Sequence, residues 1–321
     1  MANPFEIVQY WFFQKALLIS LLAAIPCAII GTFIVVKRIS MISGSISHAT
    51  FGGLGISYFL GFNPLMGATI FGVLCGSLIG ILQNRAKKRL DTILSFLWAF
   101  GMAIGLIFLY LTPGYASDLF TYLFGNLFLI TDGNLLIVLV LNVVIIATLV
   151  FTYQTLKIVL FNDEFAEVRN IPNFWVYQIF YILVSLTIIV ILSVVGVILL
   201  IAFLTLPAAI ALFYQKNMKK VMLWSGIIVL FSNILGLFLA HWIDLPPGPV
   251  IVVILAFLYL VSYVYDYAKK FIEKKKNKIE SHACDMELES FGIFQESIKG
   301  YSNHHDHEHY QTPPKSEKED T

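Results

Sequence analysis

Nine long apolar runs dominate the first 268 residues of this 321-residue chain. A helix needs about 20 consecutive apolar residues to cross a lipid bilayer, and most of the runs come close to that length. We therefore predict an all-α fold, a polytopic transmembrane helix bundle of about 8–9 spans. The runs cover residues 14–36, 46–61, 64–83, 91–111, 134–155, 174–192, 195–214, 221–241 and 249–267.

Charge is sparse in this region and dense after it. Hydrophobic residues make up 58% of the chain and charged residues only 13%, whereas about a quarter of a soluble globular chain is charged. Of the 41 charged residues, 20 lie at positions 269–321. We therefore expect two parts, a transmembrane domain over 1–268 and a charged tail over 269–321 that is too polar to fold on its own.

The positions of Lys and Arg predict the orientation. They cluster in alternate connections between the apolar runs, at 37–38, 85–89, 157–169 and 216–220, and again at the start of the tail. Basic residues near span ends stay in the cytoplasm, so the N-terminus is expected outside and the tail inside. Lys15 is the exception in this pattern. Residues 117–130 fit neither a loop nor a full span, and we interpret them as a re-entrant or interfacial helix on the outer side.

Several classes of protein are excluded or disfavoured. A net charge of +1 argues against nucleic-acid binding, and three cysteines without paired spacing argue against a disulfide framework or a thiolate metal cluster. The chain has no phosphate-binding loop, no His-Glu-x-x-His and no Gly-x-Ser-x-Gly. We expect no enzyme and no permanently bound cofactor, so any ATP hydrolysis must occur in a separate subunit.

Small residues recur every four positions in one run, at Ala68, Gly72, Gly76 and Gly80. Such a stripe lies on one helix face and lets another backbone approach closely. Helix packing within the chain is the favoured interpretation, and a homodimer seam is the alternative.

Ionisable side chains inside spans are costly and point to function. His48 lies near the start of the second run, and His241 and Asp244 close the eighth. Neutral imidazole binds first-row transition metals, so these three residues are candidates for a metal pathway. Gly44 and His48 can share a helix face. A histidine that merely hydrogen-bonds a backbone carbonyl is the alternative.

The sequence resembles the membrane subunits of ABC-type manganese, zinc and iron importers over about residues 10–268. Five stretches carry the resemblance in order: Ser45-Ile-Ser-His48-Ala with Gly52 and Gly53, Tyr122-Leu-Phe-Gly-Asn126 with Thr131 and Asp132, Phe161-Asn-Asp-Glu-Phe-Ala166, Val195–Ala211, and Asp244-Leu-Pro-Pro-Gly-Pro249. The family commonly has an acidic residue where this chain has Gly44, and a glycine where it has Asn170.

This resemblance implies a bacterial inner-membrane permease that moves a divalent transition-metal ion into the cytoplasm as its substrate. The implied partners are a cytoplasmic ATPase, an extracytoplasmic metal-binding protein and a second permease subunit, identical or different. Gly44, Ser47, Gly52 and Gly53 are expected to pack along the pathway. The resemblance also implies an ATPase-coupling segment made of Asn162, Asp163, Glu164, Phe165, Ala166, Glu167 and Arg169; a solvated loop helix is the alternative.

Two other functions stay open at this stage. A proton-coupled secondary metal transporter would need buried acidic relays, but Asp118, Asp132 and Asp244 lie near span ends. A membrane scaffold or metal sensor without transport would depend on the tail, where His304, His305, His307 and His309 form a dense cluster that can bind metal. The tail histidines are equally compatible with a polar tail of no metal function.

Overall fold

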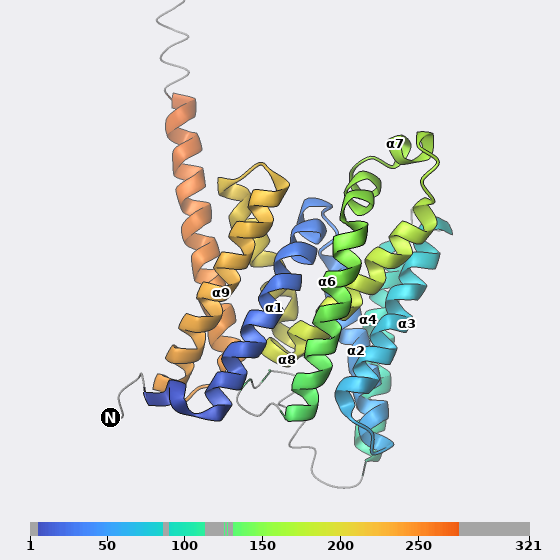
Figure 1. Ribbon diagram of the computed structural model, residues 1–321, viewed down its shortest axis with the longest axis vertical. Coiled ribbons are helices and arrows are strands. Elements are labelled where there is room, and N and C mark those ends of the chain that lie inside the picture. Colours follow the sequence, from blue (N-terminus) through green and yellow to red (C-terminus); the bar gives the residue numbers. More distant parts are fainter. Residues whose placement is uncertain (1–5, 86–89, 113–124, 126, 128–130, 276–321) are drawn as a thin grey trace, which may run out of the picture. The chain divides into compact units, whose positions relative to one another are not determined.

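The computed structural model describes residues 6–85, 90–112, 125, 127 and 131–275, and these residues contain no strand (Figure 1). Most of the predicted outer helix at 117–130 and the tail histidines lie outside the described residues. The helices are η1 (Glu6–Gln9), α1 (Trp11–Val36), α2 (Met41–Phe59), α3 (Pro64–Arg85), α4 (Leu90–Leu111), α6 (Asp132–Phe161), α7 (Asp163–Val168), α8 (Asn173–Tyr214), α9 (Met218–Ile243) and a last helix, Pro247–Lys275.

The chain divides into two compact units, Met1–Tyr263 and Val264–Thr321. The first unit contains every labelled helix. In the second, the structure describes only Val264–Lys275, where Lys270 pairs with Asp266 one helical turn away.

All nine predicted apolar runs coincide with helix. Seven helices of the described chain are long and apolar enough to cross a membrane: α1, Pro64–Gln83 of α3, α4, α6, Asn173–Val197 of α8, α9 and Pro247–Lys275. The protein is thus a multi-pass, all-α membrane protein. The other two runs form α2, which is 19 residues long and rich in Ser and Gly, and Leu199–Tyr214. They are not among the seven, so a count of 8–9 spans stays a prediction.

Helix α8 lies at the centre of the first unit. It packs against α1, α2, α3, α6 and α9, and 83% of its most apolar window is buried, more than in any of the other six membrane-length helices. Around it, α2 packs against α3 and α4, while α1 packs against α9 and α6. Because apolar side chains cover α8 on all sides, its central position follows from its sequence.

A backbone break at Gly196 divides α8 into two halves. Gly196 has φ 77° and ψ 175°, a conformation open essentially only to glycine. Figure 1 shows the chain running to one end of the unit along the first half of α8 and returning along the second. Gly125, with φ 72°, lies against this break: a Cβ atom placed on it would be 2.5 Å from the carbonyl carbon of Val195. Two stretches far apart in sequence therefore meet at a pair of glycines.

The stripe of small residues on α3 packs within the chain, which confirms the favoured interpretation. A Cβ atom added at Gly72, Gly76 or Gly80 would lie within 3.1 Å of a side chain or backbone atom of α8. The facing residues recur along α8 at the spacing of one helix face: Gln178, Tyr181, Ser185 and Ile189. The glycines let these two helices approach closely.

The unit has two ends, which we name the Lys37 end and the Gly61 end. Figure 1 shows that α1, α3 and α6 finish, and α9 begins, at the Lys37 end, so the basic connections of the first unit gather there. The α2–α3 turn at Gly61, the break in α8 and the last turn of α9 lie at the opposite end. Lys15, the exception to the predicted pattern, forms an ion pair with Asp132 at the start of α6.

Candidate functional site

His48 lies in α2 and stacks on an aromatic ring of another helix. Its imidazole is parallel to the indole of Trp98 on α4, with ring centroids 4.2 Å and planes 16° apart. The residue is partly exposed, while its Nδ1 atom is buried and has no hydrogen-bond partner among the described residues. The alternative of a histidine satisfied by a backbone carbonyl through Nδ1 therefore finds no support in this geometry.

Gly44 lies one helical turn before His48, and other side chains fill the space beside it. A Cβ atom added at Gly44 would lie 2.6 Å from Cζ3 of Trp98 and 2.7 Å from Cδ1 of Ile201 on the second half of α8. Contacts below 3 Å are not tolerated in a packed core, so any larger residue at position 44 must displace both Trp98 and Ile201.

The hydroxyl groups of α2 bond within their own helix. Ser47 donates to the carbonyl of Gly44 at 2.9 Å, and Thr50 donates to the carbonyl of Ser47 at 2.6 Å. Both side chains are fully buried. Gly52 and Gly53 are buried where α2 crosses its neighbours, with an added Cβ 3.0 Å from the Gly101 carbonyl oxygen on α4 and 2.4 Å from that of Gly67 on α3, respectively. Packing places these residues next to His48 along α2.

His241 and Asp244 lie away from His48. His241 is exposed in the last turn of α9, and Asp244 is exposed at the C-cap with φ 59°. They belong to the Gly61 end, whereas His48 lies in the first half of α2, which starts from the Lys37 end. Within the described part of the chain, no three His, Cys, Asp or Glu side chains are grouped so that they could hold a metal ion. The structure therefore does not assemble the three predicted pathway residues into one cluster.

The segment predicted to couple to an ATPase forms the short helix α7 at the Lys37 end. Asn162 caps it by accepting a hydrogen bond from the Phe165 backbone N–H at 3.0 Å. Ala166 is fully buried and anchors the helix, while Phe165 and Val168 are 43% and 82% exposed. Their apolar surface is flanked by the exposed side chains of Glu164, Glu167 and Arg169. Such a mixture of apolar and charged groups suits a protein contact.

Arg169 and Asn170 close α7. The Arg169 guanidinium lies 4.7 Å from the centre of the Phe165 ring, a cation–π contact that orients the ring. Asn170 has φ 54°, in the left-handed region that glycine adopts most easily and asparagine tolerates. This conformation explains why asparagine can replace glycine at this position.

Lys37 ties together the helices on either side of α7. Its ammonium group donates to the Leu160 carbonyl at 3.0 Å and to the Tyr177 hydroxyl at 2.7 Å, and it lies 4.7 Å from the centre of the Tyr177 ring. Leu160 is near the end of α6 and Tyr177 near the start of α8. The lysine therefore holds together the end of α6 and the start of α8, the two helix ends that α7 connects.

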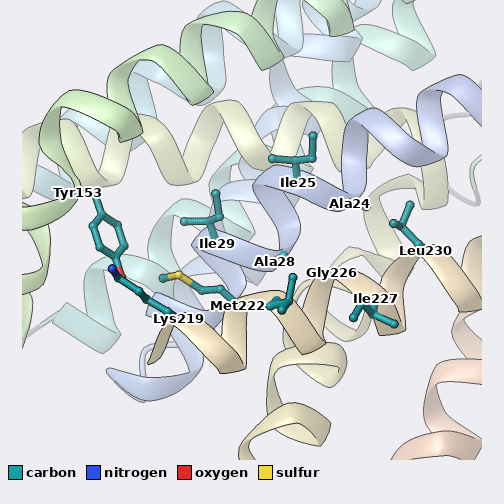
Figure 2. A pocket seen from close by; sticks show the side chains of 11 residues that line it. Ala24, Ile25, Ala28, Ile29, Tyr153, Lys219, Met222, Gly226, Ile227 and Leu230 are labelled. Carbon is teal, nitrogen blue, oxygen red and sulfur yellow. The ribbon is translucent and has the colours of Figure 1, made fainter. Parts of the chain in front are cut away.

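A pocket of about 450 Å³ opens between α1, α6 and α9 (Figure 2). Figure 2 shows Tyr153 and Lys219 together at one end of it, and the rest of its wall is apolar, including Ala24, Ile25, Ile29, Met222, Leu223, Ile227 and Leu230. None of the predicted site residues lines this pocket. It is therefore separate from the surroundings of His48.

Sequence reasoning did not single out two residues of these sites. Nothing in the sequence marked Trp98 as a functional residue, because aromatic residues are common in apolar runs. Lys37 was interpreted only as a marker of orientation, although its position directly after a span could have suggested a structural role.

Comparison with known proteins identifies a family over nearly the whole transmembrane region. The model of the ABC 3 transport family matches residues 9–266. An uncharacterized membrane protein of Synechocystis sp. is 34% identical over 261 residues, covering 81% of this chain and 92% of the relative. The manganese import system permease protein ScaB of Streptococcus gordonii is 26% identical over 267 residues, which cover 83% of this chain and 96% of ScaB.

A solved structure shares the fold. PsaBC from Streptococcus pneumoniae, in complex with Fab, superimposes with a TM-score of 0.73 at 26% identity, covering 82% of this chain and 95% of that chain. The likeness covers most of this chain and nearly all of the solved one, so the helical bundle as a whole is a shared fold.

Proposed function

The chain belongs to the ABC 3 transport family, and we propose that it is the permease subunit through which a divalent transition-metal ion (manganese, zinc or iron) enters the cytoplasm. The observation that carries this proposal is the match over residues 9–266 to a transport family, and the similarity to a permease named for manganese import supports it. That name favours manganese as the first ion to test.

The proposed topology has nine spans, with the N-terminus outside. It adds α2 and Leu199–Tyr214 to the seven long helices, because both lie in the packed bundle and connect its two ends. The Lys37 end is then cytoplasmic, because the basic connections gather there and such residues resist translocation. The Gly61 end, with His241 and Asp244, faces outward and would receive the extracytoplasmic metal-binding protein.

Helix α7 would transmit the ATPase's movements into the membrane. Its exposed Phe165 and Val168 offer an apolar contact, and Glu164 and Glu167 flank that contact with negative charge. Lys37 connects α6 and α8 to each other, so a force on α7 reaches both helices and, through α8, reaches α2. A second permease subunit, identical or different, would complete the pore.

His48 is the proposed pathway residue in the membrane. It lies between the two ends, its side chain is partly exposed, and its buried Nδ1 has no hydrogen-bond partner among the described residues. His241 and Asp244 would act separately, as outer contacts for the incoming ion. A proton relay has less support, because no Asp or Glu is buried among the residues whose side chains the structure describes.

Replacement of His48 by Ala tests the pathway. We expect ATP-dependent metal uptake to be lost while the permease still co-purifies with its ATPase. Ser95→Ala on α4 is the matched control, because its exposed hydroxyl bonds only its own helix, to the carbonyl of Asp91. Normal uptake by the His48 variant would remove this residue from the mechanism. Uptake driven by a proton gradient without any ATPase would replace the proposal by the secondary-transporter alternative.

A further inference from the structure

The stack between His48 and Trp98 has a geometry that suits a metal ligand. Two rings whose planes are only 16° apart leave both imidazole nitrogens at the rim of the stack. An ion approaches imidazole in the plane of the ring, along a nitrogen lone pair, so the indole covers a face that the ion does not need. The stack therefore fixes the direction of the lone pairs without blocking them.

The same indole occupies the place of a second ligand. Residues four apart on a helix face each other, so a carboxylate at position 44 would share an ion with His48. Here the position is Gly44, and the edge of Trp98 lies where its side chain would begin. Among the described residues, His48 belongs to no group of three or more His, Cys, Asp or Glu side chains that could hold an ion.

We propose that Trp98 is a positioning residue of the ion pathway, which orients His48 and stabilises its imidazole when the ring carries a metal ion. This inference rests on the proposed function, in which His48 meets the ion. A metal-bound imidazole bears positive charge, and the negative face of indole attracts a cation more strongly than the faces of phenylalanine or tyrosine do. Trp98 thus supplies, through its π electrons, part of the attraction that a carboxylate would otherwise give.

Two Trp98 variants separate the π face from simple packing. Trp98→Phe keeps an aromatic face, whereas Trp98→Leu keeps apolar bulk without one. We expect the KM for uptake of Mn²⁺ or Zn²⁺ to rise by about two- to thirtyfold in the Leu variant, and less in the Phe variant, at equal amounts of assembled complex. A Leu variant with the wild-type KM for both ions would overturn the proposal.

Fluorescence gives an independent readout that needs no transport. In a permease whose Trp11, Trp175, Trp224 and Trp242 are changed to Phe, Trp98 is the only indole. We expect Zn²⁺, a closed-shell ion, to change its emission saturably by charging the stacked imidazole, and His48→Ala to remove that change. A Zn²⁺ response that is absent, or unaltered without His48, contradicts the proposal. If the wild-type complex imports no metal, the proposed function fails, yet this measurement still decides the role of Trp98.

A swap tests whether indole and carboxylate occupy the same place. Gly44→Asp alone should impair uptake, because the new side chain meets Trp98. Combined with Trp98→Ala it should restore uptake above that of Trp98→Ala alone, since the indole is gone, only the end of the flexible Ile201 side chain has to shift, and the carboxylate lies one turn from His48. A double variant no better than Trp98→Ala would show that the two groups do not substitute for each other.

Discussion

The contact between Gly125 and the Gly196 break can be tested by Gly125→Ala. Alanine at φ 72° enters the left-handed region, which costs about 1–2 kcal/mol. Its Cβ would also lie 2.5 Å from the Val195 carbonyl carbon, and relieving such a clash typically costs a further 1–3 kcal/mol or so. We therefore expect the free energy of unfolding to fall by about 2–5 kcal/mol in total.

Two other glycines provide matched controls for this value. Gly61 has φ 75° but nothing within 4 Å of an added Cβ, so Gly61→Ala should cost only the backbone term of about 1–2 kcal/mol. Gly133, in the first turn of α6, has neither a positive φ nor a neighbour, so Gly133→Ala should be neutral or stabilising by up to about 1 kcal/mol.

The assay is denaturant unfolding of the purified permease in detergent, in which circular dichroism monitors the loss of helix. We expect Gly133→Ala to be the most stable of the three variants, Gly61→Ala to be less stable, and Gly125→Ala to be the least stable. If Gly125→Ala is no less stable than Gly61→Ala, the close contact between Gly125 and the break in α8 does not exist, and the account of how these two stretches meet is wrong.

Two further variants probe the ends of the bundle. Lys37→Met removes charge-assisted hydrogen bonds to Leu160 and Tyr177, each worth about 1.5–3 kcal/mol. We expect this variant to import fewer ions per ATP hydrolysed, and Tyr177→Phe to show a smaller decrease. An unchanged number of ions per ATP in Lys37→Met would contradict the role given to Lys37. Asp132→Asn removes the partner of Lys15, but its carboxylate is 78% exposed, so stability should change by no more than about 1 kcal/mol in an unfolding titration.

The sequence allowed the helices to be predicted because span length is a local property. A run of about 20 apolar residues has few alternatives to a helix in a membrane, and every predicted run is helical. The path of the chain at Gly196 was less accessible. Gly196 lies at the start of the predicted run 195–214, and neither its φ of 77° nor its contact with Gly125 can be deduced from residue types.

The candidate site was predictable only in part. His48 stood out because ionisable groups in spans are rare, and α7 because it is a polar island between apolar runs. The partner of His48 could not be foreseen, since Trp98 is 50 positions further along the chain and on a different helix. The role of Lys37 likewise depends on the approach of α6 and α8, which only the packed structure shows.

The central claim is that this permease brings a divalent metal ion into the cytoplasm. Elemental analysis of cells that lack the chain, with manganese, zinc and iron supplied one at a time, tests it most directly. The account predicts that the cellular content of one of these metals falls and is restored by the wild-type chain but not by His48→Ala. Unchanged contents of all three metals under limiting supply, in cells shown to contain no other importer for them, would contradict it.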